Sequence, residues 1–263
     1  MKHPRLLTGV IHLAPLPGSP RSSRTVSEIA KSAAADARAL QDAGFDLVMI
    51  ENFGDAPFFR GEAPPVTIAA MTACAVAVRT EAAKIPIGIN ILRNDVAAAL
   101  AIASVVGAKA VRVNVHSGAR VTDQGIVEGR AAETLRLRKS LAAEDVEIWA
   151  DIDVKHSAPL AARPIEDEAI EVSERALADA LLVTGTGTGV PVDGSDLVRV
   201  RKAVPEAKIY VASGTRLDDL KMLSEHATGI IVGSALRTSG KAGDPIDRAI
   251  AEKFANAFRK TFS

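Results

Sequence analysis

Residues 85–116 read IPIGINILRNDVAAALAIASVVGAKAVRVNVH. Two short runs rich in Val and Ile, 85–92 and 110–116, flank an Ala- and Leu-rich stretch with helical spacing, 95–106. A near-continuous run of Val and Ile is typical of a strand in a sheet that helices cover. The stretch therefore predicts one strand–helix–strand unit.

The same two textures alternate along all 263 residues, which predicts eight strand–helix units. Such a chain is expected to form an α/β fold, a single (β/α)8 TIM barrel spanning residues 1–263. A doubly wound open sheet is the alternative, but it seldom needs so many consecutive units, and no Pro-, Ser- or Gly-rich linker separates two halves. The expected strands are 6–13, 45–52, 85–92, 110–116, 146–155, 180–185, 208–214 and 229–236. The expected helices are 26–42, 66–82, 95–106, 131–143, 165–177, 195–203, 217–224 and 245–259.

Composition excludes several classes of protein. Lys plus Arg and Asp plus Glu each total 32, and this zero net charge argues against a nucleic-acid partner. Hydrophobic residues make up 48%, which excludes general disorder. A single cysteine, Cys74, excludes an internal disulfide and a cysteine-based zinc site, and it favours the reducing cytoplasm.

The apolar runs also bear on membranes and partners. None approaches the roughly 18 apolar residues that span a bilayer, so no integral membrane segment is expected, while peripheral attachment to a membrane stays open. The N-terminal apolar run ends too early, at His12 and Pro15, for a secretory signal. The Ala-rich helical exterior predicts a homo-oligomer.

The loops differ on the two ends of the expected barrel. Helix-to-strand connections are short and plain, whereas strand-to-helix connections such as 53–65 and 117–130 are longer and rich in polar residues. TIM barrels place their active sites on the strand-to-helix face. The polar loops therefore predict a functional site at the carboxyl ends of the strands.

Polar side chains stand at those carboxyl ends. Because residues two apart in a strand share a face, Asp151, Asp153 and Lys155 are expected to project together into the barrel mouth. The expected catalytic residues are Lys155, Asp153, His116, Asp151 and Glu51. The expected substrate-binding residues are His12, Asn52, Asn90, Arg93, Arg112 and Asn114.

Alternatives stay open for this cluster. Arg112 and Asp151 can form a core ion pair with a structural role only, because buried charges need partners. Lys155 can serve as a general acid, a Schiff-base nucleophile or an anion clamp. No cofactor is predicted. A divalent metal is possible, with His12, Glu51, His116 and Asp153 as candidate ligands, although the chain has no H-x-H or HExxH motif.

Glycines follow the last three strands. They let backbone N–H groups approach an anion closely, and barrels often hold a substrate phosphate at this place. Tight turns without a ligand are the alternative. The expected phosphate-binding residues are Thr186, Gly187, Ser213, Gly214, Gly233 and Ser234.

Two strand-to-helix loops are candidate lids. Residues 53–60 hold three of the seven phenylalanines, which predicts a lid or an interface, with packing on the barrel rim as the alternative. Residues 122–130 form a long, charged loop and are the second candidate lid.

Several long motifs resemble the BtpA/SgcQ family over nearly the whole chain. They are GVIHLAPLPGSP (9–20), ENFGDAPF (51–58), NILRND (90–95), RVNVH (112–116), TDQG (122–125), DVKH (153–156) and TGTGTG (184–189). The resemblance implies a ribulose-phosphate-binding type of barrel. It also implies two kinds of role, because the family name comes from a protein of photosystem I biogenesis with a membrane-associated role, while other members resemble products of sugar-utilisation gene clusters.

Two functions therefore stand as hypotheses. The first is a cofactor-independent isomerase, epimerase or aldolase acting on a small phosphorylated sugar or nucleoside-derived metabolite. The second is a non-catalytic assembly factor on the same fold, with the phenylalanine-bearing loop as its binding surface. Charged residues that point into the barrel favour the enzyme, because a scaffold has no need of them.

Overall fold

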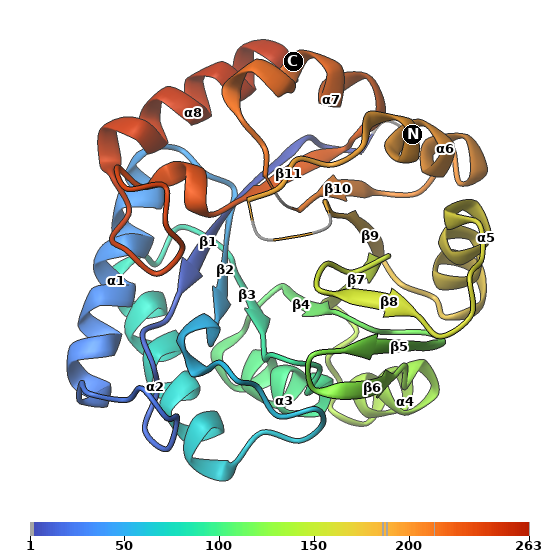
Figure 1. Cartoon of the computed structure of the whole chain (residues 1–263). Coiled ribbons are helices and arrows are strands. Elements are labelled where there is room, and N and C mark those ends of the chain that lie inside the picture. Colours follow the sequence, from blue (N-terminus) through green and yellow to red (C-terminus); the bar gives the residue numbers. More distant parts are fainter. Residues whose placement is uncertain (1–2, 186, 188, 213, 263) are drawn as a thin grey trace.

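The computed structural model describes residues 3–185, 187, 189–212 and 214–262. Eight parallel strands close into a barrel in the order β1-β11-β10-β9-β7-β4-β3-β2 (Figure 1). The predicted α/β barrel is confirmed. The barrel strands are β1 (Leu6–His12), β2 (Leu47–Glu51), β3 (Ile87–Asn90), β4 (Ala110–Val113), β7 (Glu147–Ile152), β9 (Ala180–Val183), β10 (Ile209–Val211) and β11 (Gly229–Val232).

Helices surround the barrel and alternate with its strands (Figure 1). They are α1 (Val26–Asp42), α2 (Pro65–Glu81), α3 (Val96–Val106), α4 (Ala131–Ser140), α5 (Ile165–Ile170), α6 (Gly194–Ala203), α7 (Leu220–His226) and α8 (Arg248–Thr261). Local signals fix several ends: the side chains of Thr25 and Glu28 form a capping box at α1, and Gly107 closes α3 with a φ of 67°. The expected helix 165–177 becomes a π-helix after Ile170, over Glu171–Arg175.

Two apolar layers follow from the alternation along each strand. One face of the strands packs against the helices, where Ile11, Ile50 and Ile89 are buried. The other face fills the barrel interior, where Val10, Met49, Trp149 and others form a separate cluster. Within it the rings of Trp149 and Tyr210 meet edge to face, 4.9 Å apart. Side chains thus fill the lower barrel, and polar side chains stand above them.

A small antiparallel sheet lies over the barrel rim and was not predicted. It consists of β5 (Ala119–Thr122), β6 (Gly125–Glu128) and β8 (Ser157–Pro159), in the order β6-β5-β8 (Figure 1). The charged loop 122–130 is therefore largely a β-hairpin. Its turn, Asp123-Gln124, is followed by Gly125 with a φ of 94°, a conformation that glycine adopts readily.

Every barrel strand ends one to four residues earlier than expected, and two of these ends change where candidate site residues lie. The strand predicted over 110–116 ends at Val113, and the strand predicted over 146–155 ends at Ile152. Asp153 has a φ of 49°, which stops the alternation of the strand. After these points the period-two rule holds for some side chains only: Asn114 and Lys155 lie beside Asp151, whereas His116 and Asp153 do not. Among the helices of the described residues, none combines the length and apolar character needed to cross a bilayer.

Candidate active site

The carboxyl end of the barrel carries one layer of polar side chains. His12, Glu51 and Asn90 are register partners on β1, β2 and β3, so their side chains stand on the same face. Asn90 Nδ2 donates to Glu51 Oε1 at 3.0 Å. The layer continues on β4 and β7 with Arg112 and Asp151.

Arg112 joins the two carboxylates of this layer. Its Nη1 donates to Glu51 Oε1 at 3.1 Å, while Nε and Nη2 donate to the two oxygens of Asp151 at 3.0 and 2.9 Å. Asn114 Nδ2 adds a bond to Asp151 Oδ2 at 2.7 Å. The three charged side chains are at most 6% exposed. The core ion pair left open by the sequence is therefore present, and it includes Glu51.

Charge pairing outweighs burial in this network. Burial by itself raises the pKa of Glu51, but Arg112 and Lys155 together with the Asn90 hydrogen bond hold that pKa below its usual value. Burial lowers the pKa of Arg112, yet Asp151 and Glu51 raise it further than burial lowers it. Both groups therefore stay charged, and the network is a buried, fully paired polar floor for the mouth.

Lys155 lies beside this floor. No group that the structure describes accepts a hydrogen bond from its Nζ, and its backbone carbonyl accepts one from Arg93 Nη2 at 2.7 Å. The carboxylates of Glu51 and Asp151 are already bonded to Arg112. Burial, with the positive charges of Arg112 and Arg93, lowers the pKa of Lys155 more than the two carboxylates raise it. A larger share of neutral amine results.

His12 is held as a neutral imidazole. Burial lowers its pKa to about 3, and Arg237, Lys155 and Arg112 add to that effect while Glu51 opposes it. The ring packs against Phe53 with the centroids 4.6 Å apart. Its Nδ1 is buried and bonds to nothing in the described part of the chain. A neutral ring nitrogen of this kind is a hydrogen-bond partner for a ligand rather than a charge.

Further polar atoms at this end are buried without partners among the described residues. They include Arg93 Nε, Asn114 Oδ1 and both side-chain atoms of Gln124. Gln124 lies in the β5–β6 turn, whose Asp123 interacts electrostatically with Arg93 and His156. The hairpin turn thus lies close to the mouth. Buried polar atoms normally bind water or a ligand, so these atoms mark a polar recess. Sequence reasoning placed Gln124 in a lid loop but missed it as a site residue.

Three predicted site residues lie away from the mouth. The Asp153 side chain is 54% exposed and pairs with Arg120 of β5, because the strand ends before it. His116 is buried, and its Nε2 bonds to the Ala176 carbonyl at 3.0 Å beneath the helix layer. Asn52 bonds to the backbone of Leu92 and to Asp55, so it ties two loops together. The expected inward positions of Asp153 and His116 are corrected.

The four candidate metal ligands do not come together at one site. His12 and Glu51 are neighbours, while His116 and Asp153 lie elsewhere. Within the described ranges, no three His, Cys, Asp or Glu side chains form a group that could hold a metal ion.

Glycines after β9, β10 and β11 come together at one edge of the mouth. Thr186 and Ser213 lie outside the described residues. A Cβ on Gly214 would lie 2.2 Å from the Val190 carbonyl carbon, and one on Gly233 would lie 2.8 Å from His12 Cε1. Gly187 lies near Val190 and His156, and Ser234 begins a short 3-10 turn, Ser234–Leu236. Close packing therefore explains why positions 214 and 233 are glycines, since neither has room for a Cβ.

Arg237 links the glycine-rich edge of the mouth to β1 through hydrogen bonds. Nothing in the sequence predicted this role. The side chain is 3% exposed. Its guanidinium donates to the carbonyls of Gly233, Val10 and Asp244, with distances of 3.1 Å to Val10 and 2.6 Å to Asp244. No short motif distinguishes such an arginine from a surface one.

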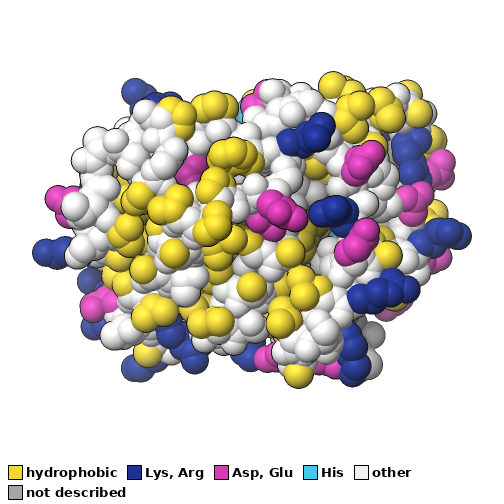
Figure 2. Space-filling model, turned by 90° about the horizontal axis from the view of Figure 1, so that it is seen from below, with side chains coloured by type: hydrophobic (Ala, Val, Ile, Leu, Met, Phe, Trp, Pro, Cys, Tyr) yellow, Lys and Arg dark blue, Asp and Glu magenta, His cyan; other side chains and the backbone are white. Residues whose placement is uncertain are grey.

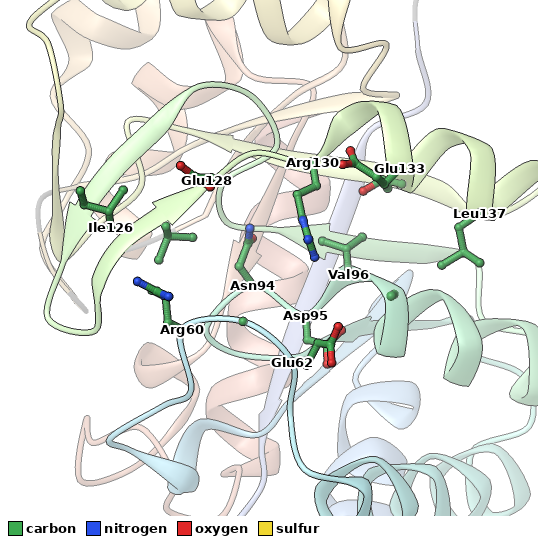
Figure 3. A pocket seen from close by; sticks show the side chains of 14 residues that line it. Arg60, Glu62, Asn94, Asp95, Val96, Ile126, Glu128, Arg130, Glu133 and Leu137 are labelled. Atoms are coloured by element: carbon green, nitrogen blue, oxygen red, sulfur yellow. The ribbon is translucent and has the colours of Figure 1, made fainter.

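The phenylalanine loop is divided between packing and exposure. Phe53 packs on His12, Phe58 lines an apolar cavity of about 510 Å³, and Phe59 is 59% exposed. Another cavity, of about 770 Å³, lies between the hairpin and the starts of α3 and α4, and Arg130 extends into it (Figure 3). Its walls also carry Arg60, Glu128 and Glu133, so both signs of charge are present and no ligand class is favoured.

Comparison with known proteins places the chain among relatives of similar length. Residues 3–260 match the model of the BtpA family. An uncharacterized protein from Methanocaldococcus jannaschii is 42% identical over 254 residues, covering 97% of this chain and 95% of the relative. The photosystem I biogenesis protein BtpA from Synechocystis is 39% identical over 249 residues, covering 95% of this chain and 86% of the relative.

Solved structures share the fold at low sequence identity. KGPDC from Streptococcus mutans has a TM-score of 0.62 at 12% identity, covering 99% of this chain and 100% of that one. N-(5'-phosphoribosyl)anthranilate isomerase from Pyrococcus furiosus has a TM-score of 0.59 at 12% identity, covering 97% of this chain and 100% of that one. At such identities the likeness establishes the barrel alone.

Proposed function

This chain belongs to the BtpA family, and we propose that it is an enzyme acting on a small phosphorylated metabolite at the carboxyl end of the barrel. The observation that carries the proposal is Lys155. A lysine with a lowered pKa, whose Nζ has no hydrogen-bond acceptor among the described residues, is available to a substrate. Perturbed amines of this kind are typical of catalytic sites.

Lys155 supplies the reactive group in either of two reactions. As a base, the neutral amine takes a proton from a substrate carbon next to a carbonyl and becomes an ammonium. As a nucleophile, its nitrogen attacks a carbonyl carbon, and loss of water leaves a Schiff base. An isomerase, an epimerase or an aldolase uses one of these steps, and none of them needs a redox cofactor.

The surrounding groups suit a polar substrate. The Glu51–Arg112–Asp151 network is fully paired, so it holds its neighbours in position rather than changing charge during a reaction. His12 Nδ1, Asn114 Oδ1 and Arg93 Nε are buried polar atoms that lack a partner in the described ranges. Substrate hydroxyl and carbonyl oxygens are suitable partners for them.

The glycine-rich edge is proposed to bind the phosphate. Gly187, Gly214, Gly233 and Ser234 belong to loops that converge here, since a Cβ on Gly189 would lie 3.8 Å from Ser234 Oγ. Thr186 and Ser213 belong to the same loops. Backbone N–H groups at such an edge can approach phosphate oxygens closely. Gly233 also contacts His12, so a phosphate here would stand next to the polar layer.

Thermal unfolding against a panel of sugar phosphates, nucleoside phosphates and inorganic phosphate tests the proposal. Each compound is measured with divalent metal and with chelator. A ligand at ~100 times its Kd adds about 2.7 kcal/mol to the free energy of unfolding, which raises Tm by roughly 5–10 °C. Lys155→Met should abolish turnover of the stabilising compound. Lys109→Met is the matched control, because Lys109 is exposed and pairs with Asp145.

Two results decide the role of Lys155. If borohydride with the stabilising compound links it covalently to wild type but not to Lys155→Met, Lys155 forms a Schiff base. If Lys155→Met turns the compound over at the wild-type rate, Lys155 is not catalytic and the proposal fails.

The second candidate function is a non-catalytic assembly factor. Phe59 is exposed above an apolar cavity, and the Synechocystis relative is named for photosystem I biogenesis. No Tm shift with any compound, in metal or in chelator, would favour this function over the enzyme.

A further inference from the structure

Two neighbouring helices present an uncharged face to the outside of the molecule. We call it the α2–α3 face, and α2 and α3 pack against each other beneath it. Its three large side chains, Val66, Val76 and Val105, are 45%, 50% and 72% exposed. The face consists of Val66, Ala69, Ala73 and Val76 on α2 and Ala97, Ala101 and Val105 on α3.

This face differs from the rest of the helical layer. α3 has no charged residue, and α2 has only Arg79 and Glu81, both in its last turn. Arg79 Nη1 donates to the carbonyls of Val106 and Gly107, so its guanidinium closes the end of α3. Every other α-helix of the described chain carries acidic or basic residues. An outer helix of a soluble barrel normally has a polar face.

The surface view agrees with the contrast between helices. Seen from the side where α2 and α3 lie in Figure 1, hydrophobic side chains gather over a broad area (Figure 2). Lys, Arg, Asp and Glu side chains stand mostly toward its margins (Figure 2). Broad apolar areas of this kind mark interaction surfaces. Depletion of charge at the centre with charges at the rim is the pattern of a protein–protein interface.

We infer that the α2–α3 face is the interface of a symmetric dimer, with a second copy of this chain as its occupant. An uncharged face needs an uncharged partner surface. Among the described helices the α2–α3 face is the one that lacks charge, so a second copy of the same face meets this need. A two-fold axis brings such a face onto itself. Alanines at 69, 73, 97 and 101 let helices approach closely, and the three valines fit between them.

The charges around the face fit the same arrangement. Arg60 and Glu62 precede α2, and Arg79 and Glu81 end it, so each end carries both signs of charge. Antiparallel pairing of α2 with its copy therefore sets opposite charges within reach at both ends. A lipid surface would instead favour a helix with basic residues along its flanks, and α3 has none. A standard protein–protein interface buries about 800 Å² of surface on each partner, which is the area that the face and its margins would have to bury in the dimer.

The mass in solution tests the inference. Light scattering after size exclusion should give twice the chain mass of 27.5 kDa for wild type at micromolar concentration. The double variant Val76→Glu/Val105→Glu should give 27.5 kDa with an unchanged circular dichroism spectrum. The matched control is Val121→Glu/Leu177→Glu, which changes valine and leucine side chains 44% and 54% exposed outside the face and should remain a dimer.

A second measurement does not depend on the glutamate variants. Cys74 is buried, so a Val105→Cys variant presents one accessible thiol. In the dimer that thiol should react slowly with a maleimide reagent, and dilution below the dimer Kd should raise the rate at least several-fold. A Val121→Cys control should react at one rate throughout. A monomeric wild type, a double variant that stays dimeric, or binding of the monomer to anionic vesicles would each overturn the inference.

Discussion

The buried arginine at the barrel mouth allows a sharp stability prediction. Arg112→Met keeps most of the side-chain volume but removes the donors that bond Glu51 and Asp151. Both carboxylates then stay buried, at 6% and 0% side-chain exposure, without their main counter-charge. Breaking a buried pair in this way costs about 3–5 kcal/mol of unfolding free energy. The expected fall in Tm is roughly 6–20 °C.

The pH dependence of the free energy of unfolding distinguishes the loss of the counter-charge from a general packing defect. In wild type the net pKa of Glu51 is lowered despite burial, so its stabilising contribution is lost as pH falls through that lowered value. Without Arg112, burial prevails, and the folded-state pKa of Glu51 should rise above its unfolded value. The variant then gains stability as pH falls from neutral toward the unfolded value. The difference in unfolding free energy between wild type and variant should therefore become smaller as the pH is lowered from ~7 to ~4.5.

Urea unfolding across that pH range measures the difference. The matched control is Arg248→Met, because Arg248 is 61% exposed and pairs with Glu252 at 2.9 Å on the surface. That variant should lose less than about 1 kcal/mol. A loss below about 1 kcal/mol for Arg112→Met would refute the reasoning. So would a larger loss that stays constant with pH.

Three further perturbations have expected outcomes. Gly214→Ala should lower the free energy of unfolding, measured in urea, by at least ~2 kcal/mol more than Gly240→Ala does. Both glycines have a positive φ, but only at Gly214 would the added Cβ collide with backbone atoms, those of Val190. Cys74 should not react with a disulfide reagent at pH ~8 until the chain unfolds, since burial raises its pKa to about 11. Between pH ~6 and ~4 the unfolded wild type binds a proton at His12, whereas the folded protein does not, because the pKa of His12 is lowered to about 3. This difference lowers the free energy of unfolding by up to about 1.4 kcal/mol per pH unit. His12→Gln lacks it and should therefore lose less stability than wild type over the same pH range. Equal losses in the two proteins would contradict the account of His12.

Local pattern predicted the elements well and their ends less well. The prediction of a helix over 26–42 matches α1 to the residue, because its apolar period lies within one segment. The strand predictions found every barrel strand but extended each at its carboxyl end, by three residues for β4, β7 and β10 and by four for β11. The apolar run continues after the last ladder bond, so the sequence has no signal for where the strand stops.

The early strand ends explain which candidate residues were misplaced. Glu51, Arg112 and Asp151 lie within strands, and the period-two rule placed them correctly. Asp153, His116, Asn114 and Lys155 all lie beyond the strand ends, where the period-two rule places a side chain correctly only by chance: it succeeded for Asn114 and Lys155 and failed for Asp153 and His116. Gln124 and Arg237 are recognised only when the β5–β6 hairpin and the loop after β11 fold back on the barrel.

Sequence alone determined the alternation of strands and helices, the barrel, the polar character of its carboxyl end and the family, because hydrophobic period, turn residues and motifs are local properties. The tertiary structure decided which polar groups meet. It paired Arg112 with two carboxylates, left the Lys155 ammonium beside them, and put the uncharged sides of α2 and α3 next to each other. The physical reason is barrel closure, which joins residues far apart in the chain, and their burial and charges then depend on one another.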